Sequence, residues 1–330
     1  MSVFASASFD GHEQVVFGHD AASGLRAIVA IHNTRLGPAV GGCRMLAYDS
    51  DDDALTDVLR LSRGMTYKSA LAGLPFGGGK SVIIGSPRRD KTPELLQAMG
   101  RLIDNIGGRY IAAEDVGTNV ADMDAIAGVT RHVAGTSATT GNPSPQTAYG
   151  VYQGILAAVA FRTRSNRGLE DVEVAIQGLG AVGFALAHLL SAAGARLHVA
   201  DISDAAVARA VGELGATPVD THDIHRIDAD VFAPCALGGA IDDNTIEELR
   251  AGIVAGSANN QLAEDRLGAE LAARGILYAP DYVINAGGII DIAYGAHMPV
   301  PYERAVVRSH IERIRDTLTE IFTRADAERA

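Results

Sequence analysis

Two lysines twelve residues apart are the residues of this sequence whose type and spacing most clearly suggest chemistry. Lys68 and Lys80 flank segment 74–79, which contains a proline and three consecutive glycines. A buried ammonium group is costly unless it is paired or meets an anionic ligand, and a glycine run lets the backbone fold tightly and approach a ligand closely. The pair therefore predicts a site for a small carboxylate, with one lysine left for catalysis. The alternative is that both are ordinary solvated surface lysines.

The same glycine run resembles a phosphate-binding loop but lacks the spacing of that motif. A phosphate-binding loop has a glycine five residues before the Gly-Lys-Ser that here occupies 79–81. Leu74 stands at that position, and the nearest glycine, Gly73, is one residue too far away. The preceding segment also has the pattern of a helix instead of a strand. We therefore reject a nucleoside triphosphatase.

A pair of acidic residues follows a short β-rich run at 109–113. Glu114 and Asp115 stand where that run gives way to a loop, which is a frequent position for a general acid or base. The alternative is a carboxylate that caps a helix or forms a salt bridge.

Segment 178–183 has the glycine spacing of a dinucleotide-binding turn in the setting that this turn requires. A predicted strand at 172–177 precedes it, a helix at 184–193 follows, and a second strand ends at Asp201, eighteen residues past Gly183. The glycines allow a tight turn, close approach of a pyrophosphate and close helix–strand packing. The helix N-terminus offers N–H groups to phosphates. Asp201 would accept hydrogen bonds from the ribose hydroxyls and repel a 2′-phosphate, which favours NAD over NADP.

The elements that must position the lysines and the acidic pair lie in the first 143 residues. Runs at 15–17 and 25–31 predict a hairpin, and 36–45 reads as a second glycine-rich bend, with Val40 either packed or forming a pocket wall. Apolar residues recur at helical spacing from Leu55 to Met65. This pattern predicts a helix that begins at 51–53 and ends at Lys68. Thr92 and Pro93 predict the start of another helix, which ends at a pair of glycines.

The second half of the chain alternates strands and helices at the spacing of a doubly wound parallel sheet. Loops 234–239, 256–261 and 281–288 follow strands, so we expect them to face a bound nicotinamide. The sequence thus predicts an α/β protein of two domains with a cleft between them. The domains expected are an N-terminal α/β substrate-binding and oligomerisation domain (1–143, joined by a C-terminal helix at 300–330) and a Rossmann NAD-binding domain (144–299).

Composition narrows the class of partners. The formal net charge of −12 argues against nucleic acid or an anionic membrane. Cys43 and Cys235 form neither a disulfide framework nor a zinc spacing, so we expect no metal. The first 14 residues lack the pattern of a secretory signal, and no apolar run has membrane-spanning length. We therefore expect a cytoplasmic enzyme.

Several sequence blocks together resemble one known family. These blocks are 36–45, 64–80, 114–123, 178–183, 232–239 and 279–288. They are similar to the leucine/phenylalanine/valine branch of the glutamate dehydrogenase superfamily. The resemblance implies reversible, NAD-linked oxidative deamination of an L-amino acid to a 2-oxo acid and ammonium. It also implies a homo-oligomer, dimeric or larger.

The resemblance also implies roles for individual residues. Lys68 would bind the substrate α-carboxylate, Lys80 would be the catalytic lysine, and Asp115 would transfer protons. The other positions implied to contact substrate are Gly41, Val40, Met65, Ala113, Asn260, Ile289 and Ile292. Those implied to contact the cofactor are Gly178, Leu179, Gly180, Ala181, Val182, Gly183, Asp201, Thr147, Ala236, Asn259 and Asn285. Which of Asn259 and Asn260 contacts substrate stays open.

The implied chemistry requires a base that works near neutral pH, whereas free lysine has a pKa of about 10.4. Desolvation of Lys80 and a second nearby cation would lower that pKa, and we expect Lys68 to be this cation. Closure of the two domains would then expel water from the substrate.

The implied side-chain pocket is lined by Val40, Ala113, Ile289 and Ile292, which suit a branched aliphatic substrate such as leucine, valine or isoleucine. No basic residue stands among them to bind a second carboxylate, which argues against glutamate. Two alternatives remain: the same reaction on phenylalanine or tryptophan, and an NAD-binding sensor without catalysis.

Overall fold

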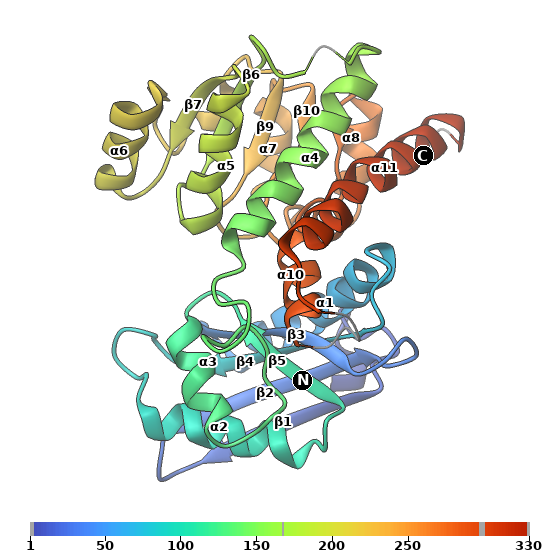
Figure 1. Cartoon of the computed structure of the whole chain (residues 1–330). Coiled ribbons are helices and arrows are strands. Elements are labelled where there is room, and N and C mark those ends of the chain that lie inside the picture. The colour runs from blue at the N-terminus through green and yellow to red at the C-terminus, as the bar shows by residue number, and fades with distance from the viewer. Residues whose placement is uncertain (1–2, 167, 297–300, 329–330) are drawn as a thin grey trace. The chain divides into compact units, whose positions relative to one another are not determined.

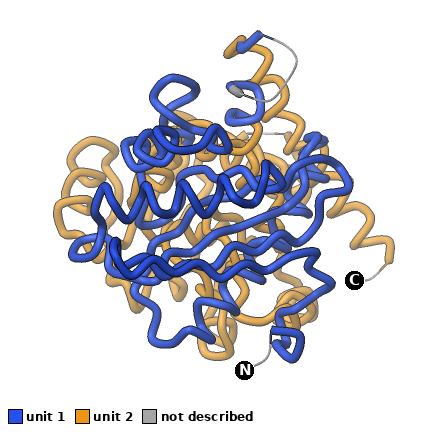
Figure 2. Tube along the Cα trace, turned by 90° about the horizontal axis from the view of Figure 1, so that it is seen from below, with its two compact units in different colours: residues 1–143, 291–302 blue, residues 144–290, 303–330 orange. Residues whose placement is uncertain are grey.

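The computed structural model of the chain describes residues 3–166, 168–296 and 301–328. The chain forms two compact units, which Figure 2 colours separately. The first comprises residues 1–143 and 291–302, and the second comprises residues 144–290 and 303–330. Each unit has its own sheet and its own hydrophobic core.

The first unit is built on a five-stranded mixed sheet with the order β1-β2-β4-β3-β5 (Figure 1). Its strands are β1 Gln14–Asp20, β2 Leu25–Asn33, β3 Ala39–Leu46, β4 Gly77–Ile84 and β5 Tyr110–Glu114. The first two form the expected hairpin, and β2 also pairs antiparallel with β4. Strand β3 pairs parallel with both β4 and β5, so residues at the carboxyl ends of β3, β4 and β5 share one edge of the sheet.

Helices cover both faces of this sheet. Helix α1 (Asp51–Leu71) packs on one face, while α2 (Pro93–Asn105) and α3 (Val120–Ala127) pack on the other; the short 3-10 helix η1 is Val3–Ala5. Both expected helix starts are confirmed, since Ser50 caps α1 and Thr92 caps α2 with Pro93 at its first position. Successive strand residues point to opposite faces, so Val82 packs under α1 and Ile83 packs under α2.

We expected glycine bends at 36–45 and 77–79. Gly37 does have a positive φ, but the remaining glycines of these segments lie within strands β3 and β4, so the expectation is wrong for them. Gly77 to Gly79 belong to β4, and none of the three has a left-handed backbone. A Cβ added at Gly77 would lie 1.9 Å from the Asn33 carbonyl oxygen, and one at Gly78 would lie 2.1 Å from the Thr66 nitrogen. Glycine is therefore required here because neighbouring backbone approaches the strand closely.

The second unit contains a six-stranded parallel sheet with the order β11-β10-β9-β6-β7-β8. Its strands are β6 Glu173–Gln177, β7 Arg196–Ala200, β8 Thr217–Pro218, β9 Val231–Pro234, β10 Ile253–Val254 and β11 Leu277–Tyr278. The strand order reverses at β6, which is the arrangement of the doubly wound dinucleotide-binding fold. The expected Rossmann sheet is confirmed.

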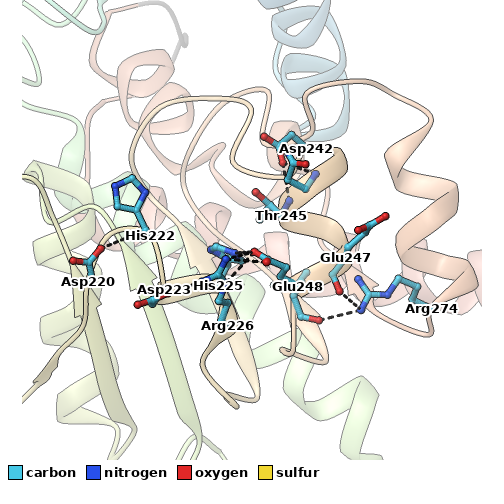
Figure 3. A network of polar contacts seen from close by, with 12 residues as sticks. Asp220, His222, Asp223, His225, Arg226, Asp242, Thr245, Glu247, Glu248 and Arg274 are labelled. Carbon is cyan, nitrogen blue, oxygen red and sulfur yellow. Dashed lines mark hydrogen bonds and ion pairs between the residues drawn. The ribbon is translucent and has the colours of Figure 1, made fainter.

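The helices of the second unit alternate with these strands. They are α4 Ser144–Thr163, α5 Ala181–Ala192, α6 Asp204–Leu214, η2 Ile224–Arg226, α7 Asp243–Glu248, α8 Leu267–Ala273 and α9 Asp281–Ile284. A surface network links η2 to α7, where Arg226 and His225 both bond Glu248 (Figure 3). Arg226 and Glu248 are 46% and 44% exposed, so the network ties two elements together with little energy and is not a site.

The C-terminal helix α11 (Arg304–Glu328) belongs to the second unit, which corrects the expectation that it joins the first. The ring of Phe322 lies 5.4 Å from that of Phe161 on α4, and the Tyr149 hydroxyl of α4 donates to Glu312 at 2.5 Å. Residues 291–302 belong instead to the first unit. The boundary between the units therefore lies within α10 (Gly287–Ala296) and not at residue 299, where it was expected. Positions 299 and 300, the expected boundary, lie outside the described residues.

None of the helices in the described part of the chain is long and apolar enough to cross a membrane.

Candidate active site

Lys80 and Asp115 form a buried ion pair at the centre of the first unit. Lys80 lies within β4, and Asp115 is the first residue after β5. The Lys80 Nζ contacts Asp115 Oδ2, and their side chains are 4% and 10% exposed. Gly42 of β3 lies between them, and a Cβ added there would be 2.6 Å from the Asp115 Cβ and 3.0 Å from the Lys80 Nζ. Gly42, which was not among the expected residues, therefore leaves the room that the pair occupies.

Arg44 is a third charged member of this site and was also not among the expected residues. Its Nε lies 3.4 Å from Asp115 Oδ2, and its Nη1 donates to Asp57 Oδ2 of α1 at 2.9 Å. The Tyr48 hydroxyl donates to the same Asp57 oxygen at 2.6 Å. The sequence carried one signal for Arg44: it follows Gly42 by two residues in a strand, so the two share a face.

Burial and neighbouring charges shift the proton affinities of the pair. Burial lowers the pKa of Lys80, Asp115 opposes this effect, and Arg44 adds to it. Burial alone would raise the pKa of Asp115, but Lys80 and Arg44 outweigh it and hold that pKa well below its ordinary value. Among the charged groups with the largest effects on Lys80, the cation is Arg44, and Lys68, the cation expected from the sequence, is not one of them.

Four of the expected substrate residues of the first unit lie on the α1 side of its sheet. Strand alternation puts Val40 and Ala113 on the same face as Lys80 and Asp115, and both are buried. Met65 and Lys68 come from α1 itself, with Lys68 buried in the last turn. Ile292 is buried and belongs to the first unit. The Gly41 carbonyl, in contrast, accepts a hydrogen bond from the buried Tyr110 hydroxyl at 2.8 Å.

In the second unit, the glycines of 178–183 occupy three different environments. Gly178 has a φ of +99°, and a Cβ there would lie 2.8 Å from the Ala236 nitrogen. A Cβ at Gly183 would lie 2.0 Å from the Gly178 oxygen. At Gly180, however, no atom of the described residues beyond its chain neighbours lies within 4 Å of the Cβ position. The chain itself leaves this space open, which fits the close approach of a pyrophosphate.

The start of α5 offers hydrogen-bond donors beside that space. Gly180 is the N-cap of α5, and no side chain of the described residues caps it. Ala181 and Val182 therefore begin the helix with N–H groups directed at the position where phosphates bind in this fold. An open pocket of ≈ 760 Å³ is lined by this segment, by Pro145, by further residues of α5 and by Arg209 of α6.

Asp201 directly follows β7 and contacts the glycine-rich turn. Its Oδ2 accepts from the Leu179 nitrogen at 2.6 Å, and its Oδ1 accepts from the Ser203 nitrogen at 2.8 Å. Ile202, which was not expected to take part, is 95% exposed, and Leu237 after β9 is 62% exposed. Large apolar side chains exposed next to a dinucleotide fingerprint suit contact with a flat ring. In the sequence, Ile202 could have been noticed because it is an apolar residue directly after Asp201.

A pair of asparagines lies at the carboxyl ends of the last strands. Asn285 is buried and donates through Nδ2 to Asn259 Oδ1 at 2.9 Å and to the Ser257 carbonyl at 3.0 Å. Its Oδ1 is buried without a hydrogen-bond partner among the described residues, which suits an acceptor kept for a ligand. Asn260 has a left-handed backbone with φ 50°. Thr147, at the start of α4, and Ile289 also belong to this unit.

A parallel dinucleotide-binding sheet in one unit and a buried Lys–Asp pair in the other define a two-domain dehydrogenase. Residues 12–132 match the dimerisation domain of the Glu/Leu/Phe/Val dehydrogenases, and residues 199–298 match the glutamate/leucine/phenylalanine/valine dehydrogenase domain. The chain belongs to this family of amino-acid dehydrogenases, which depend on a nicotinamide dinucleotide.

Relatives with known names cover nearly the whole chain. A leucine dehydrogenase of Geobacillus stearothermophilus is 52% identical over 98% of this chain and 88% of its own length. A phenylalanine dehydrogenase of Caldalkalibacillus thermarum is 46% identical over 99% of this chain and 89% of its own. The crystal structure of L-tryptophan dehydrogenase from Nostoc punctiforme superposes with a TM-score of 0.76 at 44% identity, covering 96% and 91% of the two chains. These relatives differ in the amino acid for which each is named.

Proposed function

We propose that this chain catalyses the reversible, NAD-dependent oxidative deamination of a branched-chain aliphatic L-amino acid: leucine, valine or isoleucine. The amino acid, water and NAD⁺ give the 2-oxo acid, ammonium, NADH and a proton. Curated leucine dehydrogenases that are 50–54% identical over most of the chain support the reaction and the substrate class.

The observation that carries the proposal is the buried Lys80–Asp115 pair. Deamination needs a group that takes a proton from water or from the amino group near neutral pH. Lys80 suits this role because burial and Arg44 lower its pKa. Asp115 stays ionised beside it and can accept a hydrogen bond from the substrate amino group. Lys68 would hold the substrate carboxylate, since it is buried in the last turn of the helix that covers this face.

Four features of the second unit support NAD as the cofactor. When bound, the nicotinamide accepts the hydride that leaves the substrate Cα. The open space at Gly180 and the uncapped start of α5 would hold its pyrophosphate. Asp201 would accept from the adenosine ribose and repel a 2′-phosphate, which favours NAD over NADP. Asn285 Oδ1 would accept a hydrogen bond from the ligand.

Short apolar side chains support an aliphatic substrate. Val40, Ala113 and Ile292 are buried in the first unit, and Ile289 is buried in the second. Such residues favour a branched side chain, but one methylene changes the selectivity by only about 1–3 kcal/mol. The relatives named for phenylalanine and tryptophan make aromatic amino acids the second candidate substrates.

A substrate panel tests the proposal. We expect absorbance of reduced nicotinamide to rise with L-leucine, L-valine or L-isoleucine and NAD, faster than with L-phenylalanine, L-tryptophan or L-glutamate, and faster than with NADP. An aromatic preference would overturn the substrate class. Absence of turnover with every L-amino acid, with NAD binding retained, would leave the sensor alternative.

We further propose a homo-oligomer in the cytoplasm. The name of the matched N-terminal domain supports self-association. Cys43 and Cys235 are both free thiols, which suits a reducing compartment.

A further inference from the structure

We propose that Arg44 is a positioning residue that sets where the proton resides in the Lys80–Asp115 pair, and that Asp57 and Tyr48 hold Arg44 in place for this purpose. The inference rests on the proposed function, in which Lys80 and Asp115 exchange protons with the substrate. Arg44 would act through Asp115 and Lys80 and need not touch the substrate.

The geometry places one guanidinium between two carboxylates. Arg44 Nη1 bonds Asp57 on α1 at 2.9 Å, and Arg44 Nε lies 3.4 Å from the Asp115 oxygen that Lys80 contacts. Tyr48 bonds the same Asp57 oxygen at 2.6 Å. The Arg44 side chain is only 12% exposed. A planar guanidinium can meet two carboxylates at once in fixed directions, whereas the single ammonium of a lysine cannot.

The distribution of lysines and arginines fits a site in which Arg44 keeps its charge while Lys80 changes its own. Only three of the 28 lysines and arginines are lysines, namely Lys68, Lys80 and Lys91, and all lie in the first unit. An arginine keeps its charge at any pH that a protein survives, whereas a buried lysine titrates readily. Arg44 therefore supplies a constant charge next to a lysine whose charge must change.

Of the other titratable groups near the pair, Cys43, Tyr48 and Tyr110 are neutral near pH 7, and Glu114 and Asp122 lie on the opposite side of the strands. Burial raises the pKa of Cys43 to about 11, and it raises that of Tyr110 well above its ordinary value. Burial and Asp57 raise the pKa of Tyr48. On the opposite side of the strands, burial raises the pKa of Glu114, and Asp122 bonds Lys91 at 2.7 Å. The charges that act most on Lys80 are thus those of Asp115, Arg44 and Asp57.

The signs of these effects follow from the charges. Arg44 repels the protonated form of Lys80, so loss of its charge should make Lys80 hold its proton to higher pH. Asp57 attracts the protonated form. Asp57→Asn removes this charge but keeps an amide oxygen that can still accept from Arg44, so it should act in the opposite direction. A merely structural role for either residue would not produce opposite shifts.

The test compares the pH dependence of kcat in four variants with that of the wild type. Arg44→Gln should move the rise of the deamination rate to higher pH and lower kcat at neutral pH by about tenfold or more. Arg44→Lys should partly restore both the pH at which the deamination rate rises and the kcat at neutral pH. Asp57→Asn should move the rise of the deamination rate to lower pH. Arg101→Gln is the matched control, because Arg101 pairs with Asp20 at 3.2 Å on an exposed part of the same unit; it should behave as the wild type.

A second readout does not depend on turnover. Because the chain has three lysines, ¹³C-lysine labelling gives three ε-carbon signals, and the signal lost in Lys80→Arg identifies Lys80. Its titration should move to higher pH in Arg44→Gln and stay unchanged in Arg101→Gln. If Arg44→Gln does not fold, Asp57→Asn decides by its shift to lower pH.

Unchanged titration of Lys80 in the folded variants would overturn the role of Arg44, and so would shifts in the same direction for Arg44→Gln and Asp57→Asn. Absence of turnover in the wild type would instead overturn the proposed function, and the two failures are therefore distinguishable.

Discussion

Asp201 shows how a single carboxylate connects local structure with cofactor choice. One of its oxygens bonds the Leu179 N–H of the glycine-rich turn, and the other bonds the Ser203 N–H. The carboxylate is thereby held at the end of β7, where it would meet the adenosine ribose. Its negative charge, not its ability to accept hydrogen bonds, would exclude a 2′-phosphate.

Asp201→Asn separates these two properties, because the amide oxygen can still accept from Leu179. We expect the ratio of kcat/KM for NAD to that for NADP to fall by about tenfold or more, since the repulsion of the phosphate is lost. Asp204→Asn, which removes a charge from the start of α6, is the control and should keep the wild-type ratio. An unchanged ratio in Asp201→Asn would mean that another group selects the cofactor.

At the scale of elements, the fit between β4 and α1 determines where Lys80 and Lys68 lie. Gly78 of β4 meets the Thr66 backbone nitrogen of α1 so closely that a Cβ would be 2.1 Å away. Backbone cannot move aside as a side-chain tip can, so an added methyl group must displace the helix.

Gly78→Ala should therefore lower the free energy of unfolding by about 1–3 kcal/mol and reduce activity as well, because Lys68 lies in the same helix. Gly64→Ala is the matched control within α1, where no atom of the described residues outside the adjoining chain and helix backbone lies within 4 Å of the added Cβ. It should raise the free energy of unfolding by about 0.5–1 kcal/mol, as alanine favours helix. Urea unfolding of both variants checks the prediction, and equal stability of the two would contradict it.

Two buried histidines connect the N-terminal segment to α1 and to β2. His12 Nε2 donates to the Leu59 carbonyl at 3.0 Å, and His32 Nε2 donates to the Asp10 carbonyl at 3.0 Å. Burial lowers the pKa of both. The unfolded chain, where histidine has a pKa of about 6.5, therefore takes up protons first as the pH falls. Their contribution to stability is present above that value and is lost below it.

We accordingly expect the free energy of unfolding to fall between pH 7.5 and pH 5, and the double variant His12→Gln/His32→Gln to show a flatter dependence. His19→Gln, at an exposed position of β1, should keep the wild-type slope. Urea titrations at several pH values measure this difference. The same slope in the double variant and the wild type would rule out the histidines as its source.

At the scale of the whole molecule, the sequence was most informative where the relevant interactions are local. The turn at 178–183, its flanking strands and Asp201 are contiguous, so spacing alone predicted the dinucleotide fold that β6, α5 and β7 form. Helix starts such as Thr92-Pro93 were predictable for the same reason. The lysine and aspartate positions were expected from family blocks, and their contact is a result of strands β3, β4 and β5 pairing in parallel.

Interactions between elements were not predictable in this way. Arg44 and Asp57 meet because β3 packs under α1, and no local pattern records that register. The glycines of β4 looked like a bend because a glycine run does not show whether it turns or makes room for a neighbour. The sequence predicted a C-terminal helix, but it did not identify α4 as the element on which α11 packs.

The central claim is that Lys80 carries out the proton chemistry, and its most direct test is the turnover of Lys80→Ala with L-leucine and NAD. We predict that kcat falls by about 10²–10⁴, while calorimetry shows NAD bound as tightly as by the wild type, because the dinucleotide residues belong to the other unit. Lys91→Ala, which removes a lysine of the same unit that bonds Asp122, should retain most of the activity. Wild-type turnover by Lys80→Ala would contradict the account.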